Sequence, residues 1–214
     1  ACWLNDAGFV YSYNIGLDNI SNLMQVDQVS ANQDVNSVVD CAIAVKDNGR
    51  ETMLYADGGN LKAAQIAYAS PLYSNGDDWH VRTIIEGVNA TNIELEVTSE
   101  QLEWGLFRDD MGRLHRINYN GAFWETGIIE NGPVGEDFEL VIDETDTISI
   151  LYNKGNETLL HTVNGEISTT EAIFHHEHIH DDIGLTIDGD GLLQMFSTSL
   201  ENNTTTVKLQ RSLV

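Results

Sequence analysis

The chain has 214 residues, enough for one large all-β domain or two small ones, and its 42% hydrophobic content can supply a core. It carries 34 acidic residues against 10 Lys and Arg, a formal charge of −24 that repels nucleic acid and anionic membrane surfaces. It contains no run of about 18 apolar residues, so no direct membrane insertion is expected.

A short pattern recurs five times along the chain: an apolar strand, a tight polar turn and a second apolar strand. The five turns begin at Asp6, Asp47, Ser99, Asp143 and Asp188. Their spacing of roughly 40 to 50 residues is the period of propeller blades. The sequence contains no sustained stripe of apolar residues with a 3.6-residue period, so helices are not expected.

The three middle units each divide into four short strands. The expected strands span 39–46, 51–56, 61–68 and 79–85 in the second unit, 93–98, 103–108, 113–119 and 123–129 in the third, and 138–142, 147–152, 158–163 and 167–174 in the fourth. Five to eight residues are ordinary for a strand. The sequence therefore predicts one all-β domain, a β-propeller of about five blades built from four-stranded antiparallel sheets, with units near 1–37, 38–90, 91–135, 136–180 and 181–214.

The first and last units are shorter and both are expected to lack a strand. Two arrangements remain open: the two ends complete each other in a closed ring, or the chain is a fragment of a larger propeller. An open ring would leave strand edges unpaired. The chain begins with Ala rather than Met and has no signal peptide, which indicates a processed chain or an excerpt.

The recurring pattern resembles the tandem β-propeller repeats of secreted microbial proteins, the broad sialidase/BNR-like group. The resemblance rests on a strand, an Asp-x-x-Gly turn, a strand ending in Tyr or Phe, and a second turn. It covers nearly the whole chain and implies a propeller fold. No copy contains the Asp-box Ser-x-Asp-x-Gly-x-Thr-Trp, and no arginine triad can be assigned, so sialidase activity is not expected.

Ligands of propellers usually bind on the face that carries the turns between the second and third strands and the links between blades. The links include residues 178–182. The candidate ligand-binding residues on these turns are Tyr55, Asp57, Arg108, Asp109, Tyr152 and Lys154.

The third unit also concentrates basic side chains, at Arg108, Arg113, His115 and Arg116. They either pair with Asp109 and Asp110 or form a pocket for an anion, since arginine matches carboxylates in a bidentate manner. The strongly negative surroundings favour the salt-bridge interpretation.

Two stretches contain possible metal ligands, and the candidate residues are His176, His178, His180, Asp181, Asp188 and Asp190. Histidines two apart on a strand share a face and suit zinc. The competing interpretation is a polar edge whose histidines only titrate. The stretch 188–191 resembles the start of a calcium loop but lacks a closing Glu, which favours a turn capped by its aspartates.

Two further features favour an extracellular or cell-surface protein. Cys2 and Cys41 fall in the first strands of successive units, where either a disulfide or two buried thiols can form. Glycosylation sequons begin at Asn19, Asn89, Asn156, Asn202 and Asn203.

We therefore expect a non-catalytic binding or assembly module whose partner is a glycan or a protein, and which forms a homo-oligomer or a larger assembly. The alternatives are a glycoside-acting enzyme with its site at the channel mouth, and a structural subunit of a surface layer, filament or virion. No cofactor is assigned beyond calcium or zinc at the sites above.

Overall fold

A computed structural model of the chain describes residues 2–4, 9–12, 24–28, 40–47, 50–57, 59–66, 79–176, 179–201 and 204–213. In these ranges the chain forms five antiparallel sheets, one after another, and no helix. It follows that the described residues contain no helix long and apolar enough to cross a membrane.

Each sheet is an up-and-down arrangement of consecutive strands. The first contains β1 (Cys2–Leu4), β2 (Phe9–Ser12) and β3 (Met24–Gln28). The second contains β4 (Cys41–Val45), β5 (Glu51–Asp57), β6 (Asn60–Ile66) and β7 (Trp79–Glu86). The third contains β8 (Thr91–Val97), β9 (Glu103–Arg108), β10 (Leu114–Tyr119) and β11 (Trp124–Glu130). The fourth contains β12 (Phe138–Ile142), β13 (Ile148–Lys154), β14 (Glu157–Asn164) and β15 (Ile167–His175). The fifth contains β16 (Ile179–Ile187), β17 (Leu192–Glu201) and β18 (Thr204–Leu213).

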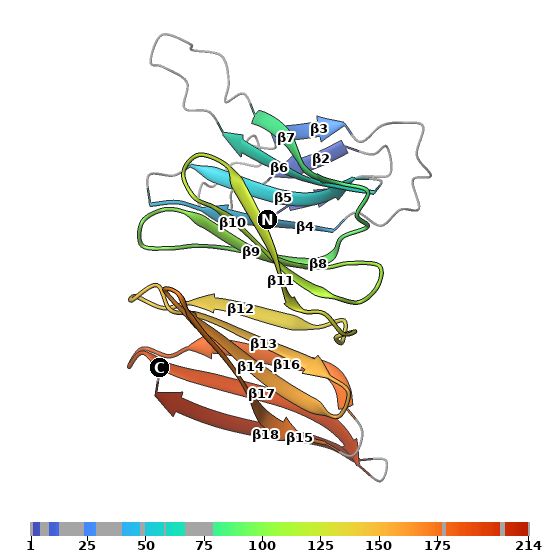
Figure 1. Ribbon diagram of the computed structural model, residues 1–214, viewed down its shortest axis with the longest axis vertical. Helices are drawn as coiled ribbons and strands as arrows, with labels where there is room; N and C mark the ends of the chain where they lie inside the picture. Colours follow the sequence, from blue (N-terminus) through green and yellow to red (C-terminus); the bar gives the residue numbers. More distant parts are fainter. Residues whose placement is uncertain are drawn as a thin grey trace.

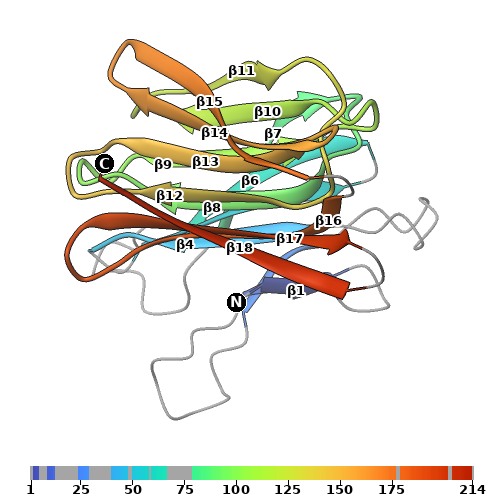
Figure 2. The same ribbon diagram turned by 90° about the horizontal axis from the view of Figure 1, so that it is seen from below.

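The sheets are arranged as the blades of a β-propeller, as the repeat predicts. The first strands of successive sheets are neighbours, so that β1, β4, β8, β12 and β16 follow one another. Figure 1 shows β2 and β3 at one end of the long axis and β17 and β18 at the other. Seen from that second end, β17 and β18 lie in the foreground (Figure 2). Among the described residues, the first and fifth sheets lie at opposite ends of this arc of blades (Figure 1).

Apolar side chains fill the space between successive sheets, because both faces of a middle sheet are covered. Leu54, Ala63 and Phe107 belong to the layer between the second and third sheets. Leu106 and Ile150 belong to the layer between the third and fourth sheets. A third layer, with members such as Leu151, Leu185 and Met195, joins the fourth sheet to the fifth. Burial on both faces explains why the second strands read as near-continuous apolar runs.

The turns between first and second strands also link neighbouring blades. The Gln101 Nε2 donates to Asp47 Oδ2 at 3.0 Å, and the Asp47 N–H donates to Gln101 Oε1 at 2.7 Å. One blade further, Ser99 N and Oγ donate to the two carboxylate oxygens of Asp146, each at 2.6 Å. The recurring turn is therefore both a hairpin and a contact between blades.

Strand boundaries differ from the predicted ones mainly in one blade link. Residues 178–182 were expected to form a link, whereas β16 already begins at Ile179. Its register shifts between Ile179 and Ile183. The bulge keeps residues 180–182 within the strand, because extra residues in one strand need not break the ladder. Elsewhere β9 and β12 have the predicted bounds, and the described first and last sheets have three strands each, as expected.

Candidate functional site

The two tyrosines predicted to contact a ligand are buried between blades. Tyr55 is 0% exposed and Tyr152 is 1% exposed. Burial raises the pKa of the Tyr152 phenol to about 12, and the negative charge of Glu130 adds to that shift. A ligand would reach either ring only after neighbouring side chains moved, so these residues contribute mainly to packing.

The charged residues predicted beside them are paired within the protein. Asp57 is buried and forms an ion pair with Lys62, on the neighbouring strand β6. Lys154 Nζ lies 2.8 Å from Glu130 Oε2 of the preceding sheet. These pairs neutralise charge at the turns and leave Lys154, whose side chain is 42% exposed, as the more accessible of the two lysines.

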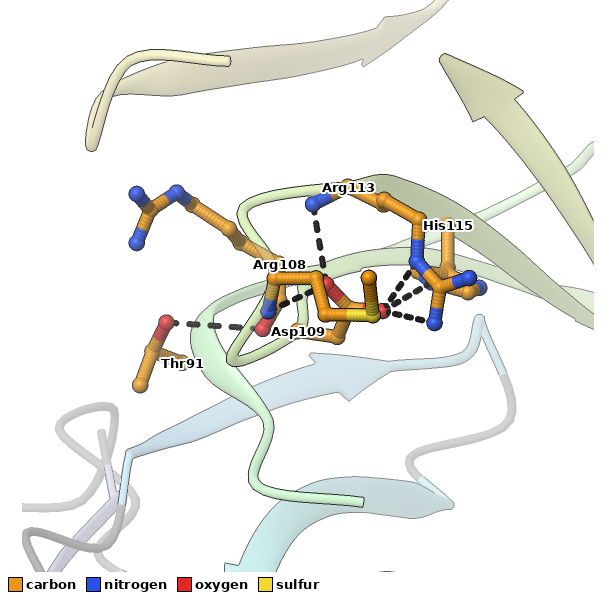
Figure 3. Close-up of polar contacts among 6 residues, drawn as sticks. Thr91, Arg108, Asp109, Arg113 and His115 are labelled. Atoms are coloured by element: carbon orange, nitrogen blue, oxygen red, sulfur yellow. Dashed lines mark hydrogen bonds and ion pairs between the residues drawn. The ribbon is translucent and has the colours of Figure 1, made fainter. Parts of the chain in front are cut away.

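Asp109 is the centre of a saturated polar cluster at the β9–β10 turn (Figure 3). Its Oδ1 accepts backbone N–H groups of Met111 at 3.0 Å and Arg113 at 2.9 Å. Its Oδ2 lies 2.7 Å from Arg113 Nε and 2.9 Å from His115 Nε2. Burial alone would raise the pKa of Asp109, but the hydrogen bonds from Arg113 and His115 outweigh it and lower the pKa to about 2.

The salt-bridge interpretation of the basic cluster is therefore confirmed for Arg113 and His115. His115 also stacks on Phe107, with ring centroids 4.7 Å apart. Arg108 points away from Asp109 (Figure 3) and its Nε donates to the Val134 carbonyl oxygen at 3.3 Å. The Asp109 cluster fixes a turn and leaves its carboxylate no free oxygen for a ligand.

The predicted metal ligands lie in two different settings. His176 is buried, and its Nε2 lies 3.1 Å from Ser197 Oγ in a polar contact between the fourth and fifth sheets. His178 lies outside the described residues, as do the side chains of His180 and Asp181. In the described part of the chain, no three His, Cys, Asp or Glu side chains are grouped to hold a metal ion.

Asp188 caps a turn, as the second interpretation of that stretch predicts. Its Oδ1 accepts the N–H groups of Asp190 at 2.9 Å and Leu192 at 3.0 Å. Its Oδ2 accepts Gln194 Nε2 at 2.9 Å and pairs with Arg211. The Leu192 N–H and Gln194 hold the pKa of Asp188 well below its usual range. Protein donors thus occupy both oxygens.

Cys41 is disulfide-bonded. The sequence contains one other cysteine, Cys2, whose side chain lies outside the described residues, and β1 lies against β4. The Cys2–Cys41 pairing stays a prediction. Of the sequon asparagines, Asn89 and Asn156 are exposed, and Asn19, Asn202 and Asn203 lie outside the described residues.

A cavity of about 540 Å³ lies between the third and fourth sheets, away from the predicted turns. Arg116, Ile128 and Ile129 line it from the third sheet. The fourth sheet contributes His161, Val163, Gly165, Glu166 and Ser168. Its volume falls within the roughly 300–1,000 Å³ of small-molecule sites. Apolar walls with a few convergent polar groups are the usual chemistry of such sites.

Arg116 is the central charged group of this inter-blade cavity. The Arg116 side chain lies beside Gly127, where an added Cβ would come within 2.8 Å of Arg116 Nε. Within the described part of the chain, Arg116 forms no ion pair. Burial lowers the pKa of His161, and the charge of Arg116 lowers it further, which favours the neutral imidazole. His161 Nδ1 lies 2.7 Å from Thr170 Oγ1.

In the sequence, Arg116 belongs to the basic cluster of the third unit, and no local motif connects it to this cavity. The partners come from the β14–β15 hairpin, about 45 residues later in the chain, one blade period away. The alternation of Arg116 with Ile117 on β10 was the available signal, since Ile117 is fully buried and Arg116 must face the other sheet.

A second cavity, of about 430 Å³, lies at the inner strands of the second, third and fourth sheets. Glu96, Asp143 and Glu144 are among its lining residues. On the same strands, burial raises the pKa of Glu94 to about 7, and the charge of Glu139 on β12 adds to this shift. The axis of the arc is therefore an acidic region where one carboxyl keeps its proton near neutral pH.

We predict that Glu94→Gln makes stability less dependent on pH. Folded Glu94 holds its proton to about pH 7, whereas an unfolded Glu ionises near 4.5, so wild-type stability falls as pH rises between these values. Because the side chain is only half-buried, we expect the variant to gain about 1–2 kcal/mol over wild type at pH 8 and little at pH 4. Urea unfolding at both pH values measures this. The exposed Glu100→Gln is the control, and an equal difference at both pH values would contradict the prediction.

Solved structures share the fold of this chain, whereas comparisons of its sequence find no match. No protein-family model matches the chain, and no curated protein matches it. Among solved structures, the fucose-specific lectin from Aleuria aurantia is 16% identical with a TM-score of 0.53, over 82% of this chain and 64% of that one. A protein of unknown function from Dyadobacter fermentans is 8% identical with a TM-score of 0.56, over 81% of this chain and 53% of that one. A leech intramolecular trans-sialidase is 11% identical with a TM-score of 0.50, over 96% of this chain and 36% of that one.

These matches show a β-propeller, since the Aleuria lectin is described as a six-bladed β-propeller. This chain spans less than two thirds of the length of that lectin. The structural neighbours, lectins and a trans-sialidase, agree with the propeller group indicated by the repeat, and the identities are too low to carry more than the fold.

Proposed function

We propose that the protein is a carbohydrate-binding β-propeller and that the inter-blade cavity at Arg116 holds the sugar. The single observation behind the proposal is the combination of polar and apolar groups there. Arg116 donates, Glu166 accepts, and Ile128, Ile129 and Val163 offer surfaces for the C–H faces of a sugar ring. A pyranose presents the matching mixture of hydroxyl donors, acceptors and apolar faces.

The charge balance favours a neutral sugar. The protein carries a formal charge of −24, which repels anionic ligands at long range. The guanidinium group of Arg116 can donate hydrogen bonds to a sugar hydroxyl as well as to a carboxylate. The fucose-binding lectins among the structural neighbours are consistent with this choice, although they are only 16% identical to this chain.

We also infer an extracellular or cell-surface location. The disulfide at Cys41 fits an oxidising compartment, because cytosolic disulfides are rare. The exposed sequons at Asn89 and Asn156 fit secretion.

Titration calorimetry against free fucose, mannose, galactose, N-acetylglucosamine and sialic acid tests the proposal. We expect a neutral sugar to bind with a dissociation constant at or below the millimolar range, and sialic acid to bind more weakly. If none of the sugars binds at millimolar concentration, the glycan proposal fails.

The acidic axis supports a second candidate function, glycoside hydrolysis. A carboxyl with a pKa raised to about 7 near a second carboxyl is the pairing that glycosidases use as general acid and nucleophile or base, and burial raises the pKa of the second carboxyl, Glu139, as well. Glu94 would donate the proton to the glycosidic oxygen, and Glu139 would act as the partner carboxylate. Release of nitrophenol from nitrophenyl glycosides, falling above pH 7 and abolished in Glu94→Gln, would support this candidate, whereas equal release by wild type and variant would exclude it.

A further inference from the structure

A buried carboxylate joins the second sheet to the third. Glu103 is the first residue of β9 and is 0% exposed. Its Oε1 lies 2.8 Å from Lys46 Nζ, in the residue that follows β4, and accepts a hydrogen bond of 2.9 Å from Gln65 Nε2 of β6. The hydroxyl of Thr52, on β5, donates to the same oxygen. Three segments of the second sheet therefore meet at one oxygen atom of the third.

Strand register brings these side chains to the same face of the second sheet. Thr52 pairs with Ala44 on one side and with Gln65 on the other, and partners across a ladder point to the same face. Ala44 belongs to the apolar layer between the second and third sheets. Lys46 lies two residues further along and also reaches Glu103, so it faces the same way.

The two oxygens of Glu103 differ sharply in their surroundings. Oε1 contacts the three donors named above, whereas Oε2 is buried and has no hydrogen-bond partner among the described residues. The Lys46 side chain is only 14% exposed, so the ion pair is largely removed from water. Burying two charges and leaving a polar atom without a partner both cost free energy. A reaction that left these groups uncharged would remove most of the cost of burying charge.

We propose that Lys46 and Gln65 form an amide cross-link, an isopeptide bond, and that Glu103 is its catalytic residue. The nitrogen of the lysine and the amide nitrogen of Gln65 contact the same oxygen of Glu103. The electrophilic carbon, Gln65 Cδ, is bonded directly to that amide nitrogen. A neutral lysine amine is a nucleophile toward carbonyl carbons. Holding both reactants on one carboxylate replaces an encounter between separate molecules and lowers the entropic part of the barrier.

The reaction requires no further reagent. Glu103 takes a proton from the Lys46 ammonium, and the neutral amine attacks Gln65 Cδ to form the new C–N bond. A second proton passes from the attacking nitrogen through the carboxyl group to Gln65 Nε2, the bond from Cδ to Nε2 breaks, and ammonia leaves. The products are a secondary amide, a protonated Glu103 and ammonia. A carboxyl group in contact with both nitrogens can act first as a base and then as an acid.

The intact mass of the full chain, produced without glycosylation and with its disulfide reduced, tests the proposal. The folded chain is expected to be lighter than its sequence mass by one molecule of ammonia. Trypsin should also leave Lys46 uncut, because its amine is blocked. The digest should then contain the peptide of residues 63–82, which includes Gln65, joined to a peptide that includes Lys46 and ends at Arg50.

Variants separate the roles of the three residues. Lys46→Arg keeps a positive charge beside Glu103 but has no amine, so it should show the full sequence mass. Glu103→Gln should slow formation of the lighter species, followed after refolding from urea, by about 100-fold or more, since it removes the acid–base group. Lys62→Arg is the matched control, because Lys62 is paired with Asp57 in the same sheet, and it should lose ammonia like wild type.

Three results would each overturn the proposal. The first is a folded wild type that keeps its full mass after prolonged incubation at neutral pH. The second is a loss of ammonia that persists in Lys46→Arg, which would indicate ring closure at an Asn-Gly pair such as Asn164-Gly165. The third is a Glu103→Gln variant that cross-links as fast as wild type. Gln65→Met, of similar length, gives a second variant without the cross-link if Lys46→Arg does not fold.

Discussion

Replacement of Asp109 by alanine is expected to destabilise the protein by about 3 kcal/mol. The carboxylate is 1% exposed and accepts two backbone N–H groups as well as the Arg113 and His115 side chains. Removing it leaves these donors without an acceptor in a partly buried site, and breaking one partner of a buried pair costs roughly 3–5 kcal/mol. Arg113 is 31% exposed and recovers some solvation, which places the expected value at the low end.

Urea unfolding at pH 7 measures this loss, and Asp110→Asn, at the exposed neighbouring position, serves as the control. The pH dependence gives a second check. Because the folded pKa of Asp109 is lowered to about 2, its contribution is fully present above about pH 4 and is lost as pH falls toward 2. A variant that matched wild type at pH 7, or a difference that grew on acidification, would contradict the structural role given to Asp109.

Replacement of Arg116 by glutamine is expected to weaken sugar binding about 10- to 100-fold. Hydrogen bonds from a charged group contribute about 1.5–3 kcal/mol, and glutamine retains fewer donors without the charge. Stability should change little, because Arg116 forms no ion pair with a described residue. Calorimetry with the best sugar of the panel gives the affinity.

Arg82→Gln, an exposed arginine of β7, is the matched control and should bind like wild type. Glu166→Gln should weaken binding by about tenfold, because it removes a charged acceptor but keeps a carbonyl oxygen. Equal binding by the Arg116→Gln and Arg82→Gln variants would show that the inter-blade cavity is not the sugar-binding site.

The fold could be predicted because each blade repeats one local pattern. The turn at Asp143 shows why: its Oδ1 accepts the N–H groups of Thr145 and Thr147, and Asp146 adopts a positive φ of 60°. These requirements are local and leave a readable signature in the sequence. The prediction of a blade link at residues 178–182 was wrong. A bulge in β16, set by pairing with β17, allows polar residues inside a strand.

The site was harder to predict, because it depends on contacts between sheets. Tyr55 and Tyr152 occupy second strands whose two faces are both covered, so residues expected at an exposed turn are buried. Arg116 and His161 meet only because the third and fourth sheets stack. The periodicity of a single strand shows on which side of the sheet a residue lies. It does not show which neighbouring sheet or side chain packs against that side, so neither contact could be predicted from it.

The most direct test of the central claim is to map sugar binding onto the protein by ¹H–¹⁵N correlation spectra during titration. Backbone shifts are expected to concentrate at the residues that line the inter-blade cavity, which are Arg116, Ile128, Ile129, His161, Val163, Gly165, Glu166 and Ser168. Shifts confined to the axis residues Glu94, Glu96 and Glu139 would contradict this claim and favour the acidic axis as the ligand site.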